Sequence, residues 1–161
     1  MPLRDGRIPV VTSVLDRLTA APASGALGSI RPGTLAALSL AVQRDLEHLL
    51  NTRREAELIP AEYHAASASL LNFGLPDPTF YSLKSPAGQQ RMRRSIESAL
   101  QSFEPRLANV TVTIEGWDEV KPVLHFRVEA VLKIEPAPEP VAFDTEFRLD
   151  SGQFALKGYP R

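Results

Sequence analysis

Residues 96–112 read IESALQSFEPRLANVTV and contain the change of period that decides the fold. Up to Phe103, apolar residues recur every three or four positions, which is typical of a helix with one buried face. From Val110 onward, apolar and polar residues alternate, which indicates a strand with one buried face. Pro105 lies at the junction and disfavours helical geometry in the residue before it. The stretch therefore predicts a helix, a fixed corner and a strand.

Three helical segments are predicted up to this corner. The first begins at Thr34, runs for about four turns and ends near residues 51–54, because its apolar residues are spaced by three and four positions. A shorter helix is predicted over 64–73, with Gly74 as a left-handed residue just after it. Residues 85–86, Ser-Pro, are typical of an N-cap and a first helical position, so the third helix begins there.

The alternating pattern predicts four strands after the corner. They cover residues 110–115, 124–134, 141–149 and 153–158, and the DSG at 150–152 is typical of a three-residue hairpin loop with its glycine in the left-handed conformation. Helices followed by a strand meander indicate an α+β fold. We expect amino-terminal helices packed on one face of an antiparallel sheet of about four strands.

The domain organisation follows from where proline and glycine, which interrupt helices and strands, are concentrated. Residues 1–33 are rich in proline and glycine, so we expect an amino-terminal arm that is partly extended, with one short element around TSVLDRL at 12–18. Residues 34–161 are then a single α+β domain.

Composition excludes several classes of protein. The 161 residues include 18 basic and 19 acidic side chains, for a net charge of −1, so no global field directs the chain to nucleic acid. The absence of cysteine excludes disulfides and thiolate chemistry and fits the cytoplasm. No apolar run is long enough for a signal peptide or for a membrane span of roughly 20 residues, so we expect no direct membrane insertion.

Catalytic and metal-binding motifs are also missing from the sequence. No serine lies in a GxSxG motif, and no phosphate-binding or dinucleotide-binding glycine motif occurs. The histidines His48, His64 and His125 lack the spacing of metal ligands. We therefore expect no catalytic residue, no metal site and no cofactor.

A glycosidase is one alternative, because that chemistry needs only two carboxylates on either side of a sugar bond. Glu104 is the candidate acid. Its candidate partners are the other acids near predicted loops: Glu62, Asp77, Asp118 and Glu119.

A phosphate-binding or nucleic-acid-binding module is a second alternative. It would use arginines at the end of the first helix and early in the third, which could converge on a phosphate. These arginines are Arg53, Arg54, Arg91, Arg93 and Arg94.

Three motifs taken together resemble a known family. RDLEHLLNTRR at 44–54, SASLLNFGLPD at 67–77 and the stretch at 96–112 resemble TssE, the small baseplate wedge subunit of bacterial type VI secretion systems. That family belongs to the small wedge proteins of contractile phage baseplates, which are often labelled lysozyme-like. The resemblance extends over about residues 8–157, in the same order and with similar spacing.

The resemblance implies an assembly function and no enzyme activity. It implies a cytoplasmic place in the baseplate of a membrane-docked machine. There the subunit would bind the larger wedge subunits TssF and TssG, and through them TssK. It would also help to nucleate the contractile sheath of TssB and TssC, by offering a free strand edge at 110–115, 141–149 or 153–157.

The resemblance also implies which residues contact partners. They are the hallmark corner and a characteristic helix end: Glu104, Pro105 and Arg106, with Asn51, Thr52, Arg53 and Arg54. Whether Arg106 faces the interior of the domain or a partner stays open at this stage.

Overall fold

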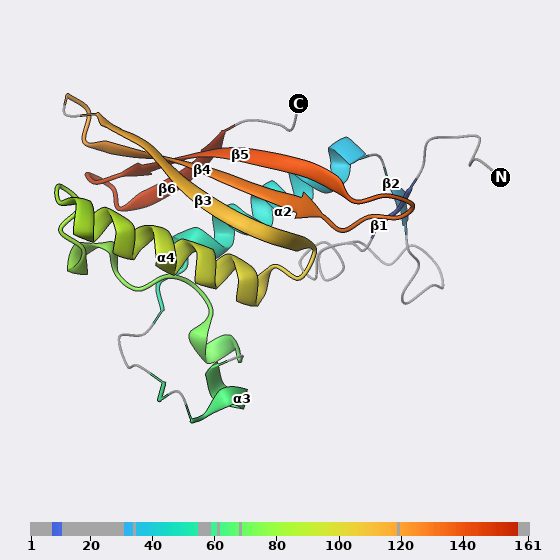
Figure 1. Cartoon of the computed structure of the whole chain (residues 1–161), viewed down its shortest axis with the longest axis horizontal. Helices are drawn as coiled ribbons and strands as arrows, with labels where there is room; N and C mark the ends of the chain where they lie inside the picture. The colour runs from blue at the N-terminus through green and yellow to red at the C-terminus, as the bar shows by residue number, and fades with distance from the viewer. Residues whose placement is uncertain are drawn as a thin grey trace.

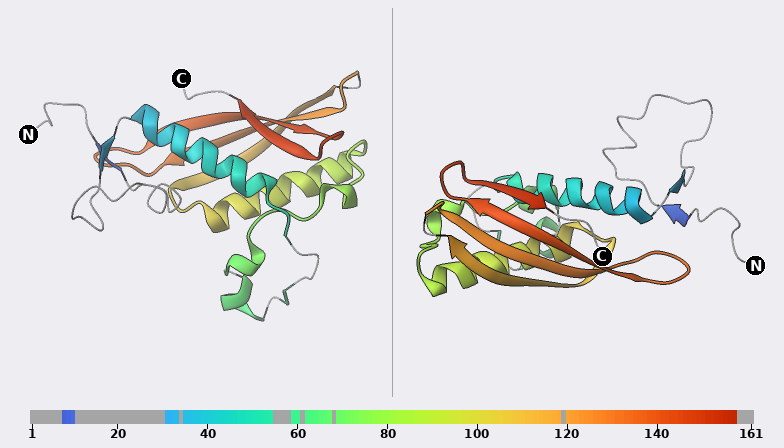
Figure 2. Two further views of the ribbon diagram at one scale, coloured as in Figure 1. Left: turned by 180° about the vertical axis from the view of Figure 1, so that it is seen from behind. Right: turned by 90° about the horizontal axis from the view of Figure 1, so that it is seen from above.

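The computed structural model describes residues 8–10, 31–33, 35–54, 59–60, 62–67, 69–118 and 120–157. Within them, two long helices pack against a four-stranded antiparallel sheet, with α4 along β3 and α2 along β6 (Figures 1 and 2). The predicted α+β fold is confirmed. The helices and strands are α2 (Leu35–Asn51), α4 (Pro86–Phe103), β3 (Leu107–Asp118), β4 (Val123–Leu132), β5 (Glu139–Arg148) and β6 (Gln153–Lys157).

Both long helices form as their apolar spacing predicts. In α4, Ser85 is the N-cap, and its Oγ accepts a hydrogen bond of 3.1 Å from the N–H of Gly88, with Pro86 in the first turn. The buried residues recur at helical spacing on one face of each helix. The buried hydrophobic residues are Leu38, Val42, Leu46, Leu49 and Leu50 in α2, and Met92, Ile96, Ala99 and Leu100 in α4.

The prediction of one helix over 64–73 is wrong. A single helical turn, α3 (His64–Ser67), is followed by a 3-10 turn, η1 (Leu70–Asn72). Ser69 provides the physical reason, because its hydroxyl donates to the carbonyl of Ala66 and accepts from the N–H of Leu71. Such local side-chain bonds compete with the helical ladder. A second 3-10 turn, η2 (Pro78–Phe80), precedes α4.

The sheet order is β3-β4-β5-β6, and every neighbouring pair is antiparallel. β4 and β5 are therefore the inner strands, and β3 and β6 are the edges. Along each inner strand, successive side chains point to opposite faces of the sheet. Those of one face are buried in the core, and those of the other face are more exposed and mostly polar. The largest fully buried side chains on the sheet are Phe126, Phe143, Phe147, Leu124 and Leu132.

The strand ends differ slightly from those predicted. β3 is longer than expected and runs to Asp118, whose carboxylate accepts hydrogen bonds from the N–H groups of Lys121 and Val120. These bonds lower the pKa of Asp118 below its ordinary value of 3.8. The hairpin after β5 is confirmed, with Gly152 in the left-handed conformation at φ 66°.

The outer face of the sheet carries a network of charges. Arg127 lies within 4 Å of carboxylate oxygens from three strands, at 3.7 Å from Glu115, 3.5 Å from Glu129 and 3.2 Å from Asp144. These groups are exposed, so they contribute little to stability. They keep this face of the sheet polar.

Little of the predicted amino-terminal arm is described. Two short strands, β1 (Ile8–Val10) and β2 (Arg31–Gly33), pair antiparallel within it. The element predicted at 12–18 lies outside the described residues, and the boundary at residue 33 stays a prediction. Among the described helices, none has the length and apolar character needed to cross a bilayer.

Candidate functional site

The corner that follows α4 is held by backbone bonds on both sides of Pro105. The N–H of Glu104 donates to the carbonyl of Leu100 at 3.0 Å and ends the helix. The N–H of Leu107 then donates to the carbonyl of Glu104 at 3.1 Å and starts β3. Because proline fixes its own φ angle, the corner presents the side chains on either side of it in one orientation.

Glu104 and Arg106 form a tight pair inside this corner. The Nε of Arg106 donates to Oε1 of Glu104 at 2.7 Å, and Nη2 donates to Oε2 at 2.5 Å. The backbone N–H of Arg106 adds a third bond to the same carboxylate at 3.2 Å. Glu104 is only 5 % exposed. Both carboxylate oxygens are thus occupied by a bidentate guanidinium.

Arg106 also reaches the first long helix. Its Nη2 donates to Oδ2 of Asp45, on α2, at 2.7 Å, and the Arg106 side chain is 15 % exposed. Burial alone would lower the pKa of Arg106, but the hydrogen bonds and charges of Glu104 and Asp45 outweigh burial and raise this pKa above its ordinary value. Arg106 therefore stays charged and faces the interior of the domain.

Lys133 holds the corner from the end of β4. Its backbone N–H donates to the carbonyl of Arg106 at 2.8 Å, and its Nζ donates to the carbonyl of Pro105 at 3.0 Å. The cluster of Asp45, Glu104, Arg106 and Lys133, here called the corner latch, ties α2, α4, β3 and β4 together.

The end of α2 makes a second set of contacts, with β6. Asn51 donates from Nδ2 to the carbonyl of Phe154 at 2.9 Å, and its Oδ1 accepts from the N–H of Phe154 at 2.8 Å. Gln43 donates to the carbonyl of Leu156 at 3.0 Å, and Arg53 donates to the carbonyl of Gly152. Helix side chains thus bind the backbone of an edge strand.

Residues 52–54 join α2 to the loop before α4. The N–H of Leu75 donates to the carbonyl of Thr52 at 2.9 Å, and the N–H of Arg54 donates to the carbonyl of Leu75 at 2.8 Å. Gly74 is left-handed, as predicted, with φ 101°, and a Cβ there would lie 2.4 Å from the carbonyl oxygen of Thr52. Only glycine fits this crossing.

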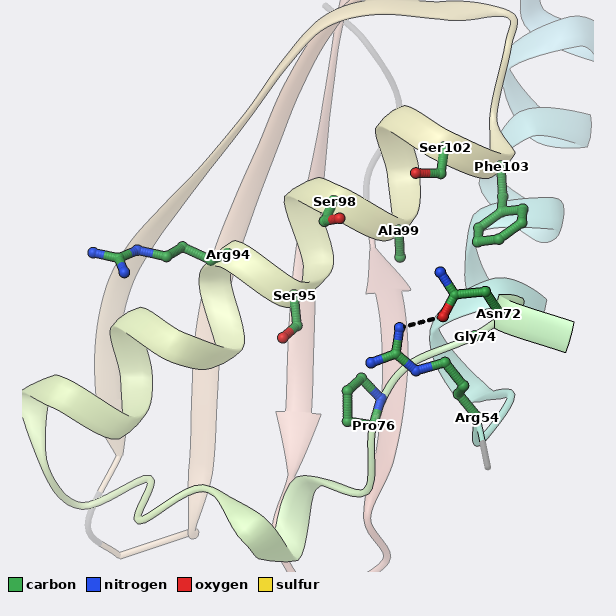
Figure 3. A pocket seen from close by; sticks show the side chains of 10 residues that line it. All are labelled: Arg54, Asn72, Gly74, Pro76, Arg94, Ser95, Ser98, Ala99, Ser102 and Phe103. Atoms are coloured by element: carbon green, nitrogen blue, oxygen red, sulfur yellow. Dashed lines mark hydrogen bonds between the residues drawn. The ribbon is translucent and has the colours of Figure 1, made fainter. Parts of the chain in front are cut away.

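Arg54 extends from this crossing into a cavity beside α4 (Figure 3). Its Nη1 donates to Oδ1 of Asn72 at 2.6 Å, and Nδ2 of Asn72 donates to the carbonyl of Ser67 at 2.9 Å. Asn72 therefore ties the segment of α3 and η1 to the end of α2.

The predicted site residues form two groups and not one. Glu104 and Arg106 belong to the corner latch, whereas residues 51–54 contact β6 and the loop at 72–75. No hydrogen bond or ion pair between the two groups is found among the described residues. The predicted convergence of arginines is only partial, because Arg54 and Arg94 line one cavity while Arg93 is paired with Glu97 at 2.7 Å.

The structure also tests the strand edges considered from the sequence. The strand predicted at 141–149 is β5, which is bonded to β4 along its whole length but to β6 only over Asp144–Arg148. Its carboxyl-terminal half is closed on both sides, whereas among the described residues Glu139–Phe143 has no partner strand on its other side, so that suggestion stays a prediction there. The outer strands of the sheet are β3 and β6.

Comparison with known families completes the description of this site. Residues 36–137 match the family described as baseplate wedge protein gp25, and the match covers more than half of the chain. This chain belongs to the gp25 baseplate wedge family. It is thus a structural wedge protein of a contractile injection system, associated with other baseplate or sheath components. A comparison with curated proteins gave no match.

In this gp25-family chain, the contacts that sequence reasoning missed are all long-range. Asp45, Asn72 and Lys133 each hold a predicted site residue from a distant segment. For Asp45 a signal exists, because a carboxylate one position before buried Leu46 lies at the border of the apolar face of its helix. Among the described residues, no group of three or more metal-ligating side chains lies close enough to hold an ion.

Proposed function

We propose that this chain is the small wedge subunit of a type VI secretion baseplate and resembles TssE. In this role it binds TssF and TssG, contacts TssK through them, and starts the sheath of TssB and TssC in the cytoplasm. Membership of the gp25 family supports a baseplate role. The motifs LLNTRR, LNFGLPD and FEPRL favour the type VI branch.

One observation favours assembly over catalysis: the hallmark carboxylate is used inside the fold. A glycosidase acid must carry a proton and reach the glycosidic oxygen. Glu104 is buried, and both of its oxygens accept hydrogen bonds from Arg106. We therefore assign Glu104, Pro105 and Arg106 to the shape of the wedge subunit, with no catalytic residue, no cofactor and no nucleic-acid partner.

The two sheet edges differ in how far they are occupied. On β6, Asn51 already binds the N–H and the carbonyl of Phe154, and Gln43 binds the carbonyl of Leu156. On β3, the N–H of Val112 is bound by Glu97 at 3.0 Å, and alternation in an antiparallel ladder turns the N–H of Ile114 outward as well. We propose that an extended segment of the sheath adds to β3.

The test combines co-purification with hydrogen exchange. The chain is expressed with TssF and TssG, and separately with TssB and TssC, and amide exchange is compared between the free and bound forms. We expect stable complexes and an amide of Ile114 that exchanges roughly tenfold or more slowly when sheath protein is bound. The amide of Phe154 is the internal control and should not change.

The possible failures are distinct. Protection of β6 amides with no change at Ile114 would show that the sheath uses the other edge. Absence of any complex with wedge or sheath proteins would overturn the type VI assignment. If the purified chain clears cell wall and Glu104→Gln abolishes this clearing, the glycosidase alternative is supported.

A further inference from the structure

A cavity of about 180 Å³ lies between the end of α2, the loop before η2 and the surface of α4 (Figure 3). Its walls come from all three segments, so it exists only in the folded chain. It is lined by Arg54, Asn72, Gly74, Pro76, Arg94, Ser95, Ser98, Ala99, Ser102 and Phe103.

The charge of this cavity is one-sided. Arg54 and Arg94 line it, and no aspartate or glutamate does. Arg54 donates from one nitrogen to Asn72, and neither arginine pairs with a carboxylate of the described residues. Figure 3 shows the guanidinium of Arg54 near the middle of the lining residues and that of Arg94 pointing away from it. Arg54 is therefore the cation that is placed to meet an anion.

The walls around Arg54 are fixed before any ligand arrives. Asn72 is held by Ser67 and Arg54, and Ser95 shares a hydrogen bond of 2.7 Å with the hydroxyl of Tyr81. The ring of Phe103 packs edge-on against Phe73, with ring centres 5.3 Å apart. A fixed guanidinium and fixed walls lower the entropic cost of binding.

An apolar pair lies next to this cavity in the chain. Leu70 and Leu71 directly precede Asn72, and they are 83 % and 74 % exposed. A free inorganic anion makes no use of two exposed leucines, whereas a protein segment with an acidic and an apolar side chain uses both features.

We propose that this cavity receives the carboxylate side chain of an acidic residue from a larger wedge subunit. In the complex, the carboxylate accepts hydrogen bonds from the free N–H groups of Arg54 and contacts the hydroxyl of Ser102. Leu70 and Leu71 contact apolar residues of the same segment. This inference rests on the proposed function, since it names the chemistry by which the wedge partner is recognised.

The first test places a carboxylate in the cavity without touching Arg54, which also holds Asn72. Ser98 is exposed and makes no hydrogen bond with the described residues, so both Ser98→Glu and Ser98→Gln should fold. We expect Ser98→Glu to weaken co-purification of the larger wedge subunits roughly tenfold, because its charge occupies Arg54. Ser98→Gln, which has equal bulk and no charge, should retain near-normal binding. Equal retention by the two variants overturns the proposal.

The second test uses the isolated chain and does not depend on any partner. Acetate is titrated to about 100 mM while the Nε–H signal of Arg54 is followed by NMR, since one carboxylate contact gives millimolar affinity at best. We expect a saturable shift in the wild type that disappears in Ser98→Glu, with sodium chloride of equal ionic strength as the control. A shift that chloride reproduces overturns the proposal.

A parallel titration with inorganic phosphate separates the two possible anions. Binding of phosphate much more tightly than acetate would make the cavity a phosphate site and overturn the carboxylate proposal. A saturable acetate shift without co-purification of wedge subunits would overturn the proposed function and leave the carboxylate chemistry of the cavity supported. If the wedge subunits co-purify and Ser98→Glu does not weaken this binding, the proposed function is supported and the carboxylate role of the cavity is overturned.

Discussion

At the scale of the residue, the hallmark Glu104-Pro105-Arg106 acts first on its own domain. Arg106 binds Glu104 and Asp45, so one guanidinium connects the corner to α2. Its Nη1 is buried without a hydrogen-bond partner among the described residues. We therefore propose that Arg106 acts on partners indirectly, through the shape that it gives to the corner.

The corner latch predicts a large loss of stability when Arg106 is removed. Arg106→Ala leaves the buried carboxylate of Glu104 without a counter-charge, which costs about 3–5 kcal/mol in the free energy of unfolding. Arg106→Lys keeps the charge but cannot bind both oxygens, so we expect an intermediate loss. Urea unfolding monitored by circular dichroism measures both values.

The matched control for this prediction is Arg91→Ala. Arg91 is an exposed arginine of α4 with no bonded partner among the described residues, so its loss should change stability by less than about 0.5 kcal/mol. Similar stability of Arg106→Ala and Arg91→Ala would contradict the role of the latch.

Sequence reasoning at this scale found the hallmark residues but not what they touch. Pro105 and the change of period were enough to predict a corner, because both are local properties. Asp45 is 61 positions from Arg106 along the chain. Such a contact depends on how α2 packs on the sheet, which no local pattern contains.

At the scale of the element, the end of α2 acts as a partial strand. The amide side chain of Asn51 offers one donor and one acceptor, and it binds the backbone of Phe154 as a neighbouring strand would. The helix therefore satisfies backbone groups that an edge strand otherwise leaves exposed.

Asn51→Ala should open this edge. The loss of two hydrogen bonds to Phe154 should lower the free energy of unfolding by about 1–3 kcal/mol, and the amide of Phe154 should exchange faster with solvent. NMR-detected hydrogen exchange measures the second effect directly. Gln101→Ala, an exposed glutamine of α4, is the control, and unchanged exchange of Phe154 in Asn51→Ala would refute the contact.

Helices, strands and turns could be predicted where the sequence pattern that specifies them is local, either periodic or a specific capping or turn residue. The helix beginning at Ser85-Pro86 and the hairpin at 150–152 were found because their capping and turn residues are specific. The helix over 64–73 was predicted wrongly, since Ser69 interrupts it by bonds to Ala66 and Leu71 that the apolar pattern does not contain.

At the scale of the whole molecule, stability should be unevenly distributed. β4 and the Asp144–Arg148 half of β5 are bonded on both sides, and these two strands carry buried phenylalanines, whereas α3 is a single turn in which no residue is buried. Figure 1 shows the segment of α3 and η1 projecting from the body below α4.

This difference predicts the pattern of hydrogen exchange in the free chain. Amides of β4 and β5 should exchange only on global unfolding, roughly a thousandfold or more slowly than those of α3. Proteolysis at low protease concentration should likewise begin in α3 and η1. Protection of α3 equal to that of β4 would mean that this segment packs on the body in solution.

The occupied edge at β6 has a consequence for the order in which a larger structure can be built. The N–H and carbonyl of Phe154 and the carbonyl of Leu156 are bound by α2, so the strand addition that we propose takes place at β3. A subunit whose sheet is extended at one edge alone corresponds to an initiator in polymer chemistry. Under the proposed addition at β3, it begins a chain of strand additions in one direction and is not inserted into the middle of one.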